Sequence, residues 1–318
     1  MNSYMSLAKD IKNGKTIYRK TYIDRTPIYA ENLENLSNID LSCIASENNE
    51  SVVYERFSGT KSIIICGGGH ISVPVSMLAK MLGYRVIVFD DRQEFANKNR
   101  FPSADLVKCG DFKDLLNEYD WQRQPDTSVV IVTRGHVADT VCLREVINKN
   151  LPYIGMIGSK KKNAAVFELL KSEGIGESDI KKVHAPIGLK IGAQTPEEIA
   201  VAIAAELIQT RNQNTDSVLD EKMLDALCNE QNKGSVMATV INKSGSAPRG
   251  VGARMLRLKK GEIIGTIGGG LAEFEAIKIM EDFKNGDKAL YNFNMSNGQA
   301  GKSGMICGGQ IDVIFEVI

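Results

Sequence analysis

Long apolar runs are missing from this sequence. None of its uninterrupted apolar stretches approaches the roughly 18–20 residues that a membrane-spanning helix needs. Residues 1–15 are polar and contain no apolar core of the kind found in a signal peptide. We therefore expect a cytoplasmic protein without a membrane partner.

Clustered cysteines and an excess of positive charge are also missing. The 6 cysteines are scattered, and no two of them form a CxxC pair, which argues against a disulfide framework and a structural zinc site. Lysine plus arginine and aspartate plus glutamate both number 39, so the formal net charge is zero. A chain without a positive field is not expected to bind nucleic acid.

Short apolar runs alternate with helical patterns between residues 61 and 211. The runs at 62–66, 85–89, 128–133 and 152–157 have the length of buried strands. This alternation predicts an α/β fold, a Rossmann-like parallel sheet with helices on both faces. Residues 212–218 are polar and predict a linker, and residues 219–318 predict a second, smaller α+β domain. Residues 1–60 form an N-terminal, strand-containing segment to which we assign no function.

A glycine loop follows the first strand of the Rossmann-like domain. Gly67 permits a tight turn, and Gly69 allows backbone to approach a phosphate at the start of the next helix. Asp90 ends the second strand, 23 residues after Gly67, where an acidic residue takes a ribose hydroxyl. The third fingerprint position is Ser72 instead of glycine or alanine. The pattern predicts a nucleotide site, and the alternative is a tight turn that binds nothing.

The 3 histidines all lie near strand ends of this domain. His70 is in the glycine loop, and His136 follows a later strand, directly after Arg134 and Gly135. Ligands of open α/β sheets bind at this edge, so His70, Arg134 and His136 are candidate ligand contacts. Together with His184 the histidines could form a metal triad, whereas the simpler interpretation is that each histidine caps a loop.

Ser159 starts a further helix after a strand. With the neighbouring N–H groups it could hold a phosphate, or it could act only as the helix N-cap.

Glycine-rich and polar loops of the smaller domain suggest a second anion site. Gly268, Gly269 and Gly270 open a helix, and Arg249 could add a bidentate contact to a phosphate. Glu273 could accept hydrogen bonds from a heterocycle or stabilise the helix start. Cys307 lies among glycines and is either a soft-metal or sulfur ligand or a small buried side chain.

Together these motifs resemble the XdhC/CoxI family of accessory factors for xanthine dehydrogenase and carbon monoxide dehydrogenase. The resemblance covers residues 61–211 and the smaller domain, but the family's usual order places the small domain first, and here the Rossmann domain precedes it. The stretches that carry the resemblance are Gly67–His70, Phe89–Arg92, Thr133–His136, Tyr153–Ser159, Pro186–Leu189, Thr195–Ala200, Ala204–Leu207, Gly245–Arg249, Gly265–Glu273 and Cys307–Gly309.

The resemblance implies the role of a cofactor chaperone more than that of a turnover enzyme. Such a protein binds molybdenum cofactor (molybdopterin), protects its sulfurated form and delivers it to a molybdenum hydroxylase client. A cysteine desulfurase is the implied source of sulfur, and a homodimer is the implied assembly. Under this interpretation Arg249 and Gly268–Gly270 suit the phosphate, Glu273 suits the ring, and Cys307 suits the molybdenum or the labile sulfur.

Two other functions remain compatible with the sequence. The Rossmann unit is also typical of an NAD(P)-dependent oxidoreductase, although the smaller domain offers no obvious acid or base for hydride transfer. A nucleotide-binding sensor or interaction module is the second alternative.

Overall fold

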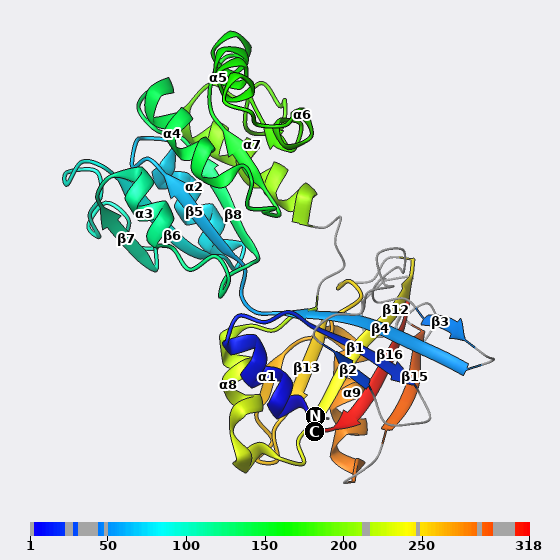
Figure 1. Ribbon diagram of the computed structural model, residues 1–318. Coiled ribbons are helices and arrows are strands. Elements are labelled where there is room, and N and C mark those ends of the chain that lie inside the picture. The colour runs from blue at the N-terminus through cyan, green and yellow to red at the C-terminus, as the bar shows by residue number, and fades with distance from the viewer. Residues whose placement is uncertain are drawn as a thin grey trace. The chain divides into compact units, whose positions relative to one another are not determined.

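The computed structural model describes residues 3–22, 28–30, 44–47, 50–211, 217–245, 249–284, 288–294 and 309–318. The chain forms two compact units, one of residues 60–214 and one that combines residues 1–59 with residues 215–318 (Figure 1). None of the described helices is long and apolar enough to cross a membrane.

The first unit contains a 6-stranded sheet in the order β10-β9-β8-β5-β6-β7. All of its neighbouring strands are parallel, which confirms the predicted Rossmann-like fold. The strands at the centre are buried along their whole length, as expected for a sheet covered on both faces. The six strands are β5 (Ser62–Cys66), β6 (Arg85–Asp90), β7 (Leu106–Cys109), β8 (Thr127–Ile131), β9 (Ile154–Met156) and β10 (Val183–His184).

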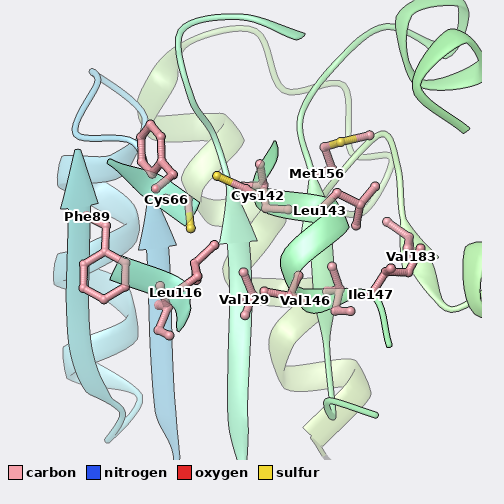
Figure 2. Close-up of a cluster of buried hydrophobic side chains, with 14 of the residues drawn as sticks. Cys66, Phe89, Leu116, Val129, Cys142, Leu143, Val146, Ile147, Met156 and Val183 are labelled. Carbon is pink, nitrogen blue, oxygen red and sulfur yellow. The ribbon is translucent and has the colours of Figure 1, made fainter. Parts of the chain in front are cut away.

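Helices cover both faces of this sheet, because successive residues of each strand point to opposite sides. Ile64 belongs to a cluster of buried side chains on the face covered by α3 (Phe112–Glu118), α4 (His136–Val146) and α5 (Lys160–Ser172). Figure 2 shows part of this cluster. Ile63 and Ile65 pack on the opposite face against the second and seventh helices. The helices are α2 (Ser72–Met81), α3 (Phe112–Glu118), α4 (His136–Val146), α5 (Lys160–Ser172), α6 (Glu177–Ile180) and α7 (Pro196–Arg211).

Two cysteines of this unit are part of its core. Cys66 and Cys142 are both fully buried and lie in the cluster of Figure 2. A hydrogen bond with the Cys66 thiol, together with burial, raises the pKa of Cys142 well above its ordinary value. Cys142 therefore stays protonated and behaves as a small apolar side chain.

The second unit is built from two sheets. One is antiparallel in the order β14-β13-β12-β16-β15, and the other has the order β11-β4-β1-β2, with β3 also paired to β4. The strands of the first sheet are β12 (Val236–Ser244), β13 (Arg254–Arg257), β14 (Ile263–Gly265), β15 (Lys288–Asn294) and β16 (Gln310–Val317). Those of the other are β1 (Ile17–Tyr22), β2 (Ile28–Ala30), β3 (Ile44–Glu47), β4 (Glu50–Ser58) and β11 (Ser217–Val218). The helices are α1 (Tyr4–Lys12), α8 (Glu221–Cys228), the short η1 (Glu230–Asn232) and α9 (Gly270–Asp282).

The N-terminal segment is thus an integral part of the second unit. Residues 212–216 of the predicted linker lie outside the described residues, while Ser217 and Val218 pair with β4 instead of serving as linker. Sequence patterns missed this pairing because it joins two segments that are distant along the chain.

A buried network of charged groups ties the segment to the rest of this unit. Arg19 donates from Nε to Glu55 at 2.7 Å and lies 3.0 Å from Glu316 through Nη1. Glu55 also pairs with Arg254, and the Tyr4 hydroxyl donates to Glu316 at 2.9 Å. The charged side chains are all nearly inaccessible to solvent, so each depends on its partners for compensation. The network joins α1, β1 and β4 to β13 and β16.

Candidate functional site

The strand order of the first unit creates a switch point between β5 and β8. From β5 the chain proceeds to β6 and β7 on one side, whereas β8, β9 and β10 extend the sheet on the other side. In open α/β sheets, ligands bind in the crevice outside the carboxyl ends of two such strands. His70 and Arg134 lie in the loops after β5 and β8, and His136 is the first residue of α4, so the fold brings these three predicted residues to one edge.

Each glycine of the first loop has a different environment. Gly67 has φ +110°, and a Cβ added there would lie 2.4 Å from the Val132 carbonyl oxygen. A Cβ on Gly68 would lie 2.5 Å from the Phe95 carbonyl oxygen. At Gly69, by contrast, an added Cβ would meet no described atom within 4 Å. Packing therefore explains Gly67 and Gly68, while Gly69 presents open backbone, as a phosphate contact requires.

Asp90 fixes this loop from the end of β6. Its buried carboxylate accepts from Gly68 N–H at 2.7 Å, and Arg92 donates to it from Nε and Nη2, each at 2.9 Å. Burial alone would raise the pKa of Asp90, but the hydrogen bonds from Arg92 and Gly68 outweigh it and the pKa is lowered. Both oxygens are engaged by the protein, so the ribose contact predicted for Asp90 stays a prediction and would require Arg92 to move.

Arginines surround the glycine loop. Arg134 is exposed over 60% of its side chain and pairs with Asp91 at 2.9 Å. Arg100 donates from Nε to the Gly68 carbonyl at 2.7 Å. Arg100 was missed by sequence reasoning, since only the folded loop brings it to the glycines. These cations make the edge attractive to an anionic ligand.

The histidines do not converge on one point. His70 is exposed in the loop after β5, and His136 is exposed at the start of α4. His184 instead ends β10, and its Nδ1 lies 3.2 Å from Glu206 Oε1. Among the described residues no group of three or more histidine, cysteine or acidic side chains is placed to hold a metal ion.

Side chains of the protein cap the start of α5 and order the loop before α4. Ser159 is the N-cap of α5, and its hydroxyl accepts from Lys162 N–H at 3.3 Å. Its predicted phosphate contact is not tested by this arrangement. In the first turn of α4, the buried Asp139 accepts from the Thr133 hydroxyl at 2.6 Å, and burial raises the pKa of Asp139. The Asp139 carboxyl therefore orders the loop that carries Arg134.

The glycine turn of the second unit is hydrogen-bonded to a carboxylate of the protein itself. Gly268, Gly269 and Gly270 have φ values of 132°, 77° and 66°, which favour glycine. One oxygen of Glu273 accepts from Gly269 N–H at 3.0 Å and from Ile267 N–H at 3.2 Å. The N–H of Gly269, which the sequence suggested for a phosphate, is thus bound to Glu273.

Arg249 and Cys307 are the remaining predicted ligand contacts of the second unit. Arg249 is exposed. Cys307 and residues 246–248 lie outside the described residues. The structure therefore leaves the predicted roles of Arg249 and Cys307 as predictions.

Replacing Asp90 by asparagine tests the anchoring of the loop. Because the folded-state pKa of Asp90 is lowered, its carboxylate stabilises the unit above the unfolded-state pKa of about 4, and this stability is lost as pH falls through the folded-state pKa. At pH 7 we expect Asp90→Asn to lower the free energy of unfolding by about 2 kcal/mol. The difference from the parent should shrink below pH of about 4.

Urea unfolding followed by Trp121 fluorescence measures this effect, since Trp121 is the only tryptophan and lies in the first unit. Asp91→Asn is the matched control, because Asp91 pairs with the exposed Arg134. Equal stability of Asp90→Asn and the parent at pH 7 would contradict the anchoring role.

Comparison with known proteins places both parts of the chain in the same family. A family model of the XdhC Rossmann domain matches residues 63–207, and a model of the XdhC and CoxI family matches residues 228–293. The chain is 33% identical over 157 residues to a probable xanthine dehydrogenase subunit of Bacillus subtilis (strain 168), covering 49% of this chain and 45% of that protein. It is 31% identical over 151 residues to the uncharacterized protein YqeB of Escherichia coli (strain K12), covering 47% of this chain and 27% of YqeB.

The chain is also similar to a solved structure. The crystal structure of a xanthine dehydrogenase from Bacillus halodurans is 25% identical and aligns with a TM-score of 0.50, covering 66% of this chain and 63% of that chain. The chain spans less than half the length of the two curated relatives. Because the two family models match in succession, Rossmann domain first and smaller domain second, the chain belongs to the XdhC and CoxI family.

Proposed function

We propose that this protein is an accessory factor for a xanthine dehydrogenase-type molybdenum hydroxylase. It binds molybdenum cofactor as cargo and delivers the sulfurated form to the client. The observation that carries the proposal is the presence of both family domains in one chain. In the first unit, the space beside Gly69 at the switch-point edge is open. The names of the Bacillus relatives, which both refer to xanthine dehydrogenase, support the choice of client.

The chemistry of the switch-point edge supports a phosphorylated ligand. A Cβ added to Gly69 would meet no described atom within 4 Å, and Arg134 offers an exposed guanidinium in the loop after β8. The exposed His70 and His136 add hydrogen-bond donors and acceptors at the same edge. The natural occupants are the phosphate of molybdopterin or a nucleotide, including NAD(P).

The second unit supplies a different contribution under this proposal. Since Glu273 already neutralises the Gly268–Gly270 turn, the exposed Arg249 is the better partner for an anionic group of the cargo. Cys307 ligates molybdenum or protects its labile sulfur, because a thiolate prefers soft metals. A cysteine desulfurase supplies the sulfur, and the protein works as a homodimer.

Alanine substitutions at Gly67 and Gly69, the first and last glycines of the loop after β5, separate effects on ligand binding from effects on folding. Gly69→Ala should change the free energy of unfolding by no more than about 0.5 kcal/mol, because the added methyl meets open space. The same methyl blocks phosphate approach, so we expect binding of NADH, used as a fluorescent probe, to weaken about tenfold or more. Gly67→Ala should instead destabilise the unit, since its Cβ would collide with Val132.

Titration of NADH fluorescence and urea unfolding together measure both effects. If Gly69→Ala binds NADH as tightly as the parent, the glycine loop is not the nucleotide site.

Purification of the protein from molybdate-replete cells tests the carrier role. We expect molybdenum and pterin to co-purify in nearly equal amounts, and Cys307→Ala to retain several-fold less of both while its NADH affinity is unchanged. Cys109→Ala is the matched control, because Cys109 is exposed but belongs to the first unit. Repeated absence of pterin and molybdenum from the parent would refute the carrier role, and equal retention by Cys307→Ala would remove Cys307 from the site.

A further inference from the structure

A second concave site lies in the first unit, beside the last strand of its sheet. It is a cleft of about 580 Å³, within the range of sites for small organic ligands. Its walls come from α5, from the loop after β10 and from α7. The lining residues are Lys160, Asn163, Ala164, Phe167, Ala185, Pro186, Gly188, Leu189, Lys190 and Glu206. None of these residues belongs to the loops after β5 and β8, so the cleft and the switch-point loops are formed by different residues.

One face of α5 forms the first wall. Lys160, Asn163, Ala164 and Phe167 follow the i, i+3, i+4, i+7 spacing that places residues on the same side of a helix. The loop after β10 forms the opposite wall and is held against α7, since a Cβ on Gly188 would lie 3.1 Å from the Ala202 side chain. Both walls are therefore parts of the packed unit.

Glu206 places a buried carboxylate in this cleft. The Tyr153 hydroxyl donates to its Oε2 at 2.6 Å, Gly188 N–H donates to the same oxygen at 2.8 Å, and His184 Nδ1 lies 3.2 Å from Oε1. Burial alone would raise the pKa of Glu206, but these hydrogen bonds outweigh it and the pKa is lowered. Since a carboxylate has about four acceptor positions, Oε1 retains capacity for one further donor.

The other lining side chains have complementary chemistry. Lys160 and Lys190 are exposed and place positive charge on opposite walls. Phe167 and Leu189 contribute apolar surface that suits a flat ring. The cleft thus offers cations for an acidic group, apolar walls for a ring and a carboxylate oxygen for an N–H group.

We propose that this cleft binds a small planar heterocycle that carries both an N–H donor and an acidic substituent. The ring lies between Phe167 and Leu189, its N–H donates to Glu206, and its acidic group contacts Lys160 and Lys190. Purine nucleotides and pterin carboxylates share this chemistry. The site goes beyond the proposed function, which depends on the switch-point edge and on the second unit.

Calorimetric titration of the full chain with AMP and with pterin-6-carboxylate tests the proposal. We expect saturable binding of at least one probe, and the tighter one identifies the ring system. Glu206→Gln, Lys160→Ala and Lys190→Ala should each weaken that probe about tenfold. Glu197→Gln and Lys161→Ala are matched controls, because they lie in the same helices, are exposed and do not line the cleft.

Adenosine and inorganic phosphate each supply half of the required chemistry and should bind at least about tenfold more weakly than the preferred probe. Gly69→Ala should leave this binding unchanged, which distinguishes the cleft from the switch-point edge. The proposal is overturned if neither probe binds, or if both lysine variants bind as tightly as the parent. Binding that is lost in Gly69→Ala but kept in the lysine variants would also overturn it, by assigning the probe to the switch point.

Discussion

The ligand edge of the first unit depends on how the Asp90 carboxylate holds the glycine loop. Gly68 donates to it from the loop, and Arg92 covers its remaining lone pairs. Gly67 packs against the segment after β8 and Gly69 stays open, while Asp139 orders the loop on the β8 side of the switch point. Under the proposed function, a ligand would meet backbone that is already in place at this edge, which lowers the entropic cost of binding.

The second unit is assembled from two separate parts of the chain. The family's small domain follows the Rossmann domain here, and the N-terminal segment rejoins it through β1 and β4. The Rossmann unit is therefore inserted between two parts of the second unit. Two buried ion pairs explain why those parts belong together, because Glu55 of the N-terminal segment pairs with Arg254 and Arg19 of that segment pairs with Glu316.

Sequence reasoning succeeded where the determinants are local. The apolar run Ser62–Cys66 followed by glycines was enough to predict a strand, a turn and a helix. It failed where partners are distant along the chain. Nothing near Arg100 or Glu206 indicates that one reaches the glycine loop and the other lines a cleft. For Glu273 the sequence left two roles open, and its bond to Gly269 N–H agrees with one of them, stabilisation of the helix start.

In the proposed function the two units have different roles. The switch-point edge of the first unit binds the phosphate of the ligand, and Cys307 of the second unit contacts its molybdenum or labile sulfur. The central claim of this account is delivery of cofactor to a client enzyme. The most direct measurement mixes purified, cofactor-loaded protein with the apo form of a xanthine dehydrogenase-type hydroxylase and follows xanthine oxidation. The account predicts that activity rises as pterin moves from this protein to the enzyme, in proportion to the amount transferred. A client that stays inactive, although free sulfurated cofactor activates it, would contradict the account.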